Sequence, residues 1–284
     1  MQPARWKAAW RRIQKANPLH YLILSVWSFI VLFPIWTMII NSFKKQLDIF
    51  RSPFTFPAVP RLDGYRYVIQ DSDFLRYCLN TVFVVAVTIF FVLLTGSLAA
   101  FALANWKGRL SRFLYLFFLT GIMVPIRLGT INIFQIIRGL GLMGSMYSLI
   151  PVYVAWGLPI AVFALTTFIQ ELPKELMEVA ALDGASRLRT YYSIILPLVR
   201  PALGTVAILN LINIWNDIWF PLIFNLKERH RTLLLGVTYF FGTYQTDWTK
   251  VLVVLTLSTI PILILYLLMS SQFIKGLTAG AIKG

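Results

Sequence analysis

The stretch LNTVFVVAVTIFFVLLTGSLAAFALA, residues 79–104, contains 26 residues and no charged side chain. Because about 20 apolar residues in a helix span the hydrocarbon core of a bilayer, this stretch predicts a transmembrane helix. The rest of the chain is similar: 58% of its residues are apolar and 13% are charged, against about 45–50% and about 25% in soluble domains. A soluble domain of 284 residues could not bury so much apolar surface, so we expect a membrane protein with several spans.

Six apolar stretches of this kind follow one another along the chain. They predict an all-α fold, a polytopic membrane helical bundle of about six transmembrane helices. The third stretch stops before Pro125 and another apolar stretch, residues 130–137, follows it; the sequence leaves open whether this span kinks at Pro125 or gives way to a separate surface helix. The six stretches are Tyr21–Ile40, Leu79–Ala104, Phe113–Val124, Ser148–Ile169, Pro201–Phe224 and Val251–Gln272.

The chain is basic, with 26 Lys and Arg against 11 Asp and Glu and a formal net charge of +15. The basic residues flank the apolar stretches, which is typical of a membrane surface and argues against nucleic acid as a partner. Five basic residues and no acidic residue precede the first stretch, which favours a cytoplasmic N-terminus. We therefore expect a cytoplasmic basic segment at 1–19, a transmembrane domain at 20–272 with a cytoplasmic loop at 171–200, and a cytoplasmic tail at 273–284.

Groups that would carry chemistry or drive transport are scarce. Asp217 is the only charged residue within the six predicted spans, whereas carriers coupled to protons or sodium place several ionisable groups in the bilayer. The sequence has no G-x-x-x-x-G-K-[ST] phosphate loop, and its two histidines, His20 and His230, lack H-E-x-x-H spacing. We therefore expect a non-enzymatic subunit that binds no metal and no cofactor, with the energy for transport supplied by another chain.

A polar but patterned segment lies between the fourth and fifth stretches, ELPKELMEVAALDGASRLRTYYSIILPLVRP at residues 171–201. Pro173 suits the first turn of a helix, where its missing N–H costs nothing. Glu171 and Glu175 suit the positive end of the helix dipole. The spacing i, i+3, i+4 then predicts one apolar stripe on this helix, formed by Leu176, Val179 and Ala180.

The second half of this segment carries turn and cap signals. Gly184 can take the left-handed conformation that ends a helix, and Ser186 could cap a second helix. Pro197 and Pro201 then break the chain as it returns to the membrane. A small-residue helix face beside a tight glycine turn would let another backbone approach closely. The spacing equally allows a loop helix that lies on its own bundle.

The same segment resembles part of a known family. Glu178-Val179-Ala180, then Asp183-Gly184-Ala185, then Ile194-Ile195-Leu196-Pro197 resembles the EAA loop of ABC-importer permeases, with Val179 in place of the first alanine. Three further motifs resemble the maltose-type carbohydrate importers, and in particular the permease subunit whose C-terminal tail has the last of these motifs. They are LNT at 79–81, NIWND at 213–217 and GLTAGAIKG at 276–284.

The resemblance implies a type I ABC-importer permease that works with other chains. This chain would form a sugar pathway with a second, different permease in the plasma (inner) membrane of a prokaryote, with both termini cytoplasmic. Two ATPase subunits would hold ATP and Mg²⁺, and an extracytoplasmic solute-binding protein would deliver the sugar. The implied ATPase contacts are Glu178, Ala180, Ala181, Asp183, Gly184, Leu196 and Pro197 in the loop, and Thr278, Ala279, Gly280 and Lys283 in the tail.

Polar residues on the fifth predicted span are candidates for the sugar pathway. Asn210, Asn213 and Asp217 have the spacing i, i+3, i+7, which predicts one polar stripe on a helix. Two tryptophans share a neighbouring face. Amides can donate to and accept from hydroxyl groups, but hydrogen bonding between helices with a tryptophan belt fits the spacing equally well. The candidates are Asn210, Asn213, Trp215, Asn216, Asp217 and Trp219.

The cargo is predicted less closely than the class of transporter. No Lys or Arg lies within a predicted span, which favours a neutral sugar over a phosphorylated cargo, since phosphate groups are usually held by basic side chains. The same class of importer could instead move a polyol, a glycoside or glycerol phosphate. An ATP-independent carrier or channel is the remaining alternative. The scarcity of charged residues within the predicted spans argues against it.

Overall fold

The computed structural model describes residues 18–238, 240–241 and 246–281, the stretch 269–281 by its backbone only. Every regular element in these ranges is a helix. Four helices are long and apolar enough to cross a membrane, and two bent helix pairs raise the number of candidate spans to as many as six. The prediction of an all-α, polytopic membrane bundle is therefore confirmed within the described residues.

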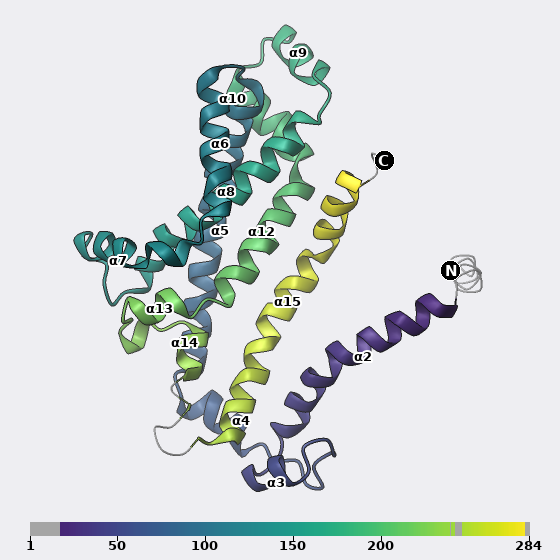
Figure 1. Cartoon of the computed structure of the whole chain (residues 1–284), viewed down its shortest axis with the longest axis vertical. Helices are drawn as coiled ribbons and strands as arrows, with labels where there is room; N and C mark the ends of the chain where they lie inside the picture. Colours follow the sequence, from purple (N-terminus) through teal and green to yellow (C-terminus); the bar gives the residue numbers. More distant parts are fainter. Residues whose placement is uncertain (1–17, 239, 242–245, 282–284) are drawn as a thin grey trace. The chain divides into compact units, whose positions relative to one another are not determined.

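The helices follow one another closely along the chain (Figure 1). The long, unbroken ones are α2 (Pro18–Asn41), α5 (Phe74–Asn105), α8 (Leu149–Gln170) and α15 (Trp248–Ala281). The bent pairs join α6 (Arg109–Met123) to α7 (Thr130–Gly139) at 91°, and the segment Arg187–Leu198 to α12 (Arg200–Trp215) at 73°. The short helices are α3 (Gln46–Arg51), α4 (Asp63–Arg66), α9 (Glu175–Leu182), α10 (Arg187–Thr190), α11 (Leu196–Leu198), α13 (Trp219–Ile223) and α14 (Leu233–Thr238).

Two of the predicted spans are interrupted. The third ends as α6 at Met123, and a 3-10 turn, Ile126–Gly129, leads from Pro125 into α7, so a separate, sharply bent helix follows Pro125. The fifth was predicted as one span, Pro201–Phe224, and this is wrong, because α12 ends at Trp215 and α13 starts at Trp219. The aspartate between these two helices binds the first backbone N–H groups of α13, which starts a new helix in the middle of an apolar run.

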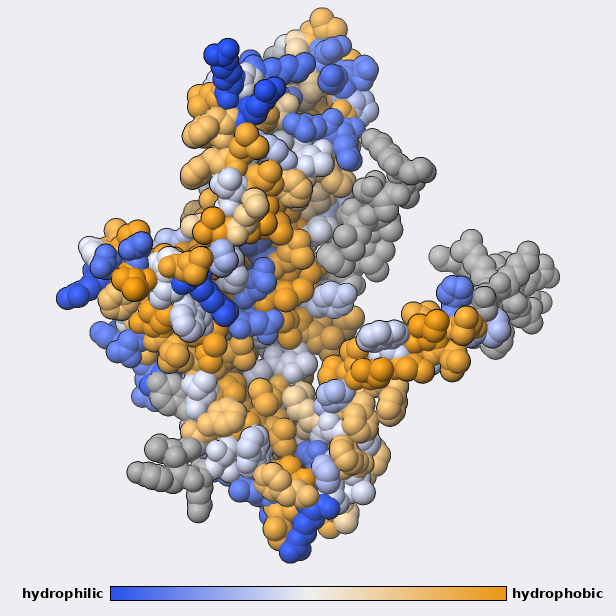
Figure 2. Space-filling view, viewed as in Figure 1, coloured by the Kyte–Doolittle hydropathy of each residue, from blue (hydrophilic) through white to orange (hydrophobic). Residues whose placement is uncertain are grey.

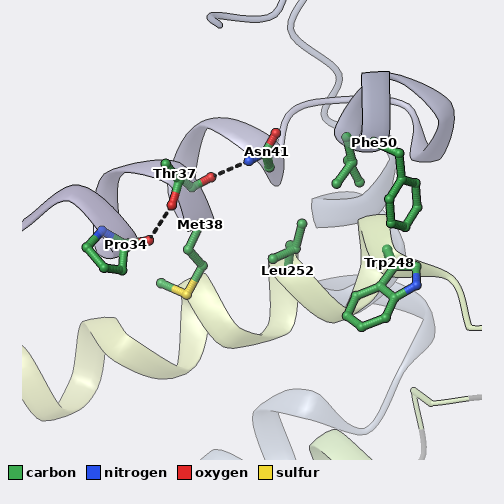
Figure 3. A pocket seen from close by; sticks show the side chains of 8 residues that line it. Pro34, Thr37, Met38, Asn41, Phe50, Trp248 and Leu252 are labelled. Atoms are coloured by element: carbon green, nitrogen blue, oxygen red, sulfur yellow. Dashed lines mark hydrogen bonds between the residues drawn. The ribbon is translucent and has the colours of Figure 1, made fainter. Parts of the chain in front are cut away.

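The chain divides into two compact units, residues 1–70 with 242–256, and residues 71–241 with 257–284. The first unit contains a pocket of about 390 Å³ lined by α2, α3 and the start of α15 (Figure 3). Thr37 Oγ1 donates to the carbonyl of Pro34 at 2.9 Å, and the rings of Phe50 and Trp248 meet edge to face at 6.3 Å. No charged side chain lines this pocket, and we assign it to packing.

Lys44 follows α2 in the first unit and is only 2% exposed. Its Nζ donates to the carbonyl of Ser52 at 2.7 Å, which fastens the connection between α2 and α3. Burial lowers the pKa of Lys44, and the nearby carboxylate of Asp48 opposes that shift. A second tie in the same unit joins Ser42 Oγ and Tyr65 Oη at 2.5 Å.

In the second unit α5 packs along α8, and both contact α12. The three helices pack tightly at Gly157 of α8, where a Cβ atom would overlap Oδ1 of Asn210 and lie 2.9 Å from the side chain of Val92. Small residues at such crossings let transmembrane helices pack tightly. The buried core of this unit is formed by Val92, Ala100, Ala161, Leu165, Ile169, Ile195, Val199, Ala202 and Val206.

The LNT motif at 79–81 ties a loop to α5. Asn80 Nδ2 donates to the carbonyls of Arg229 and Arg231, both at 2.9 Å. Thr81 Oγ1 accepts from the backbone N–H of Leu233 at 2.8 Å. This motif therefore holds the segment between α13 and α14 against the helix, a positioning role that its sequence pattern alone did not indicate.

Candidate functional site

The segment between α8 and α12 forms the predicted two-helix hairpin, with α9 as its first arm. Glu175 and Glu178 lie in the first turn of α9, where the helix dipole favours a negative charge. The prediction for Glu171 is wrong, because this residue ends α8 instead. Pro173 lies two residues ahead of α9, so it precedes the helix rather than occupying its first turn.

A glycine turn ends α9 as predicted. Gly184 has φ +72°, the left-handed conformation. Its N–H donates to the carbonyl of Ala181 at 3.1 Å, and the N–H of Ala185 donates to that of Ala180 at 2.9 Å. This pair of bonds is the Schellman motif, which satisfies the last carbonyls of a helix. Asp183 is the exposed residue that links the helix to this turn.

The two faces of α9 differ from the prediction. Ala180 is buried, and Met177, rather than Leu176, packs against the core of the second unit. Val179 was expected on the same apolar stripe, but it is 55% exposed, and Leu182 is 87% exposed. The predicted stripe is therefore wrong: it is rotated about the axis of α9 by about a quarter turn from the face that is covered. The packing of the hairpin on α5 and α8 selects which face is covered. Glu178 and Ala181 are exposed with Val179.

The second arm of the hairpin begins at the predicted cap. Ser186 Oγ accepts from the backbone N–H of Arg189 at 3.3 Å, and α10 starts at the next residue. Tyr191 is buried and its Oη lies 2.6 Å from Ser97 Oγ on α5, which fastens this arm to the bundle. Leu196 is half-buried and Pro197 exposed in α11, just ahead of the 73° bend into α12.

The predicted polar stripe of the fifth span is divided by the end of α12. Asn210 and Asn213 lie on α12, whereas Asp217 and Trp219 lie beyond its last residue, Trp215. These residues therefore do not share one helix face, and that part of the prediction is wrong. Asn216 ends the helix, and its Nδ2 donates back to the carbonyl of Ile212 at 2.8 Å; Trp215 is buried.

Asp217 is buried among groups that use both of its carboxylate oxygens. Oδ2 accepts from Tyr153 Oη at 2.8 Å and from the N–H of Phe220 at 3.2 Å, and Oδ1 accepts from the N–H of Trp219 at 3.3 Å. Arg127 approaches Oδ1 at 4.0 Å. This geometry favours the structural reading of Asp217, as the residue that starts α13 and ties it to α8.

Asn210 and Asn213 line a pocket of about 390 Å³ at the break between α6 and α7. Trp156 of α8 and Arg127 also line it, and neither was among the predicted candidates. Arg127 is 63% exposed at its side chain and lies over the ring of Trp219, 5.7 Å from the centroid. Its place follows from the turn after Pro125, which the sequence left undecided. A basic side chain therefore lines the candidate sugar pocket, and the expectation of a neutral cargo loses support.

The tail residues predicted to reach an ATPase are only partly described. Thr278, Ala279 and Gly280 lie within the helical backbone of α15, and their side chains lie outside the described residues. Lys283 lies outside the described residues altogether. The role of the tail stays a prediction.

Known proteins resemble this chain over nearly all of its length. Residues 92–278 match the family described as the binding-protein-dependent transport system inner membrane component. An ABC transporter permease protein of Caldicellulosiruptor sp. is 35% identical over 96% of this chain and 99% of its own. The trehalose/maltose transport system permease protein MalG of Thermococcus litoralis is 35% identical over 90% of this chain and 92% of its own.

The fold is shared with a solved transporter. The crystal structure of a bacterial ABC transporter involved in the import of the acidic polysaccharide alginate contains a similar chain, with a TM-score of 0.78 and 20% identity. The match covers 90% of this chain and 95% of that one. These findings confirm the resemblance to maltose-type ABC permeases and imply a multi-pass protein of the inner membrane. The chain therefore belongs to the family of binding-protein-dependent transport system inner membrane components.

Proposed function

We propose that this chain is one permease subunit of an ATP-driven carbohydrate importer, which receives force through the α9–α10 hairpin. One observation carries the proposal: this hairpin turns an apolar surface outward at the polar end of the bundle. Val179, Leu182 and Leu188 are 55%, 87% and 63% exposed. Figure 2 shows hydrophilic residues gathered around this end of the second unit. Apolar side chains exposed in such polar surroundings mark a protein contact.

The opposite face of the hairpin is fixed to the bundle. Met177 and Leu172 pack against the buried core, Ala180 is buried, and Tyr191 is hydrogen-bonded to Ser97 on α5. A partner that moves the exposed face would therefore move the transmembrane helices with it. In this proposal an ATPase subunit contacts the exposed face differently in its nucleotide-bound and nucleotide-free states. That difference in contact free energy shifts the bundle between its outward- and inward-facing conformations.

A carbohydrate cargo is supported by the relatives and by the pocket at the α6–α7 break. The similar proteins include permeases of trehalose/maltose, diacetylchitobiose and arabinooligosaccharide transport systems. The pocket combines the amides of Asn210 and Asn213 with the indole of Trp156, and a few polar groups on an aromatic wall suit a sugar. A polyol, a glycoside or glycerol phosphate remains the alternative, and Arg127 on the pocket wall makes an acidic cargo worth testing.

The other subunits are part of the same proposal. A second, different permease completes the pathway, two ATPase subunits hold ATP and Mg²⁺, and a solute-binding protein delivers the sugar from outside. The chain itself catalyses no reaction and holds no cofactor. Both of its termini and the α9–α10 hairpin lie on the cytoplasmic side, in keeping with the five basic residues that precede the first span.

Reconstitution into liposomes tests this proposal. Uptake of a labelled sugar panel, neutral and acidic, should require ATP, the solute-binding protein and both permeases together. Omitting any one component should reduce uptake to the level of empty liposomes. Flux through liposomes that contain this chain alone would contradict the proposal and favour a carrier or channel.

A further inference from the structure

Another pocket lies beside the first arm of the hairpin. It has a volume of about 760 Å³ and is lined by the end of α5, the start of α6, the end of α8 and the first turn of α9. Its residues belong to the second unit only. Of the implied ATPase contacts in the hairpin only Glu178 lines it, and no candidate residue of the sugar pathway does.

The rim of this pocket is cationic. Lys107 from the α5–α6 turn, Arg112 from α6 and Lys174 ahead of α9 line it, together with one carboxylate, that of Glu178. All three basic side chains belong to exposed residues, and none forms an ion pair in the part of the chain that the structure describes. Three basic side chains from separate elements on the wall of one pocket favour an anionic group within it.

The interior of the pocket holds an unused hydrogen-bonding group. Thr166 of α8 lines the pocket and is 1% exposed, and its Oγ1 has no hydrogen-bond partner among the described residues. A buried hydroxyl without a partner is uncommon in folded proteins, because its lost hydrogen bonds to water are not replaced. A ligand oxygen inside the pocket would replace one of those bonds.

The chemistry of the walls distinguishes among anions. Apolar side chains form much of the lining, among them Leu103, Ile169 and Met177. The helix that supplies Arg112 also exposes Phe113 and Phe117, at 63% and 62%. A free phosphate ion would gain nothing from these apolar surfaces, whereas a lipid would place its glycerol and acyl carbons on them. Trp106 and Tyr115 on the rim are the aromatic residues typical of the membrane interface.

We infer that this pocket binds the phosphate headgroup of an anionic phospholipid. Basic pockets between transmembrane helices recognise such headgroups. The phosphate would bridge Lys107 and Arg112, on the bundle, to Lys174, which directly precedes α9. Bound lipid would thereby fasten the root of the hairpin to the bundle. The inference rests on the proposed function only for the leaflet, which is the cytoplasmic one.

Native mass spectrometry of the full chain, purified within its assembled transporter, tests this inference directly. The probes are phosphatidylglycerol, phosphatidylcholine and inorganic phosphate, added in turn to delipidated protein. We expect phosphatidylglycerol to bind in preference to phosphatidylcholine, and millimolar inorganic phosphate not to displace it. Replacing Lys107, Arg112 and Lys174 by Gln should weaken phosphatidylglycerol binding about fivefold per residue, and about a hundredfold together.

Arg109→Gln is the matched control, because this residue lies one turn from Arg112 on α6 and does not line the pocket. It should leave binding of phosphatidylglycerol unchanged. Thr166→Val keeps the shape of the side chain, removes the hydroxyl and should weaken binding while the melting temperature is maintained or raised. Equal binding of both lipids, displacement by inorganic phosphate, or an equal loss in Arg109→Gln would each overturn the inference. None of these readouts needs ATP or sugar, so failure of the proposed transport function would be seen separately.

Discussion

Gly184 allows a test of why the α9–α10 hairpin has a glycine at its turn. Its φ of +72° is a conformation that residues with a Cβ adopt at a cost of about 1–2 kcal/mol. A Cβ atom built there meets nothing within 4 Å among the residues that the structure describes. Within that part of the chain, backbone conformation is therefore the cost of Gly184→Ala. That cost would make the open form of the last turn of α9 about five- to thirtyfold more populated.

Asparagine tolerates the left-handed conformation better than alanine, although its side chain is larger. If backbone conformation is the reason for Gly184, amide exchange at residues 180–186 should increase in the order Gly, Asn, Ala. Sugar-stimulated ATPase activity of the reconstituted transporter should fall in the same order. If close approach of an ATPase backbone is the reason, the order of the two variants reverses, because Ala is smaller than Asn. An activity for Gly184→Ala above that of Gly184→Asn would refute the conformational account.

Three further changes test the packing around the site. Gly157→Ala should destabilise the chain by about 1–3 kcal/mol, because the added methyl overlaps the facing amide on α12. Gly139→Ala is the control, since its Cβ meets no described atom within 4 Å, and equal melting temperatures of the two variants would contradict this. Asp217→Ala should cost about 2 kcal/mol or more by removing the cap of α13, measured as the change in chemical denaturation midpoint, and wild-type stability would show that the cap is dispensable. Burial lowers the pKa of His230 below 6.5, and the positive charges of Arg229 and Lys227 lower it further. The unfolded chain therefore binds the proton more tightly than the folded chain does. The contribution of His230 to stability is then present above about pH 6.5 and lost as the pH falls through the lowered pKa. The protection factors of the amides at residues 225–233, which correct for the slower intrinsic exchange at low pH, should therefore fall on acidification, and a His230→Gln variant with the same pH response would contradict this.

The spans could be predicted because apolar length is decided locally. Leu79–Ala104 lies wholly inside α5, and α8 covers Ser148–Ile169 but for its first residue, which belongs to the preceding turn. The glycine turn and the serine cap of the hairpin were also predictable, since each depends on the preferences of one residue. These features need no knowledge of distant contacts.

The errors arose where distant contacts override a local pattern. The hydrophobic run through α12 and α13 reads as one span, but Asp217 is held by Tyr153 of α8 and interrupts it. The spacing on α9 predicted Leu176 on the core side, whereas the neighbouring helices pack against Met177. Arg127 reaches the candidate sugar pocket only through the bend after α6. None of these contacts leaves a signal in the spacing of residues.

The central claim is that the exposed face of α9 contacts an ATPase subunit, and site-directed crosslinking tests it most directly. Cys78, the chain's single cysteine, is first replaced by serine. Leu182→Cys, which is 87% exposed on α9, should then crosslink to an ATPase subunit in the assembled transporter, with a yield that changes when ATP binds. Leu128→Cys, 81% exposed in the turn between α6 and α7, should give no such product. If the cysteine at 182 never crosslinks to an ATPase, or is labelled by a membrane-impermeant thiol reagent added outside intact cells, the account is contradicted.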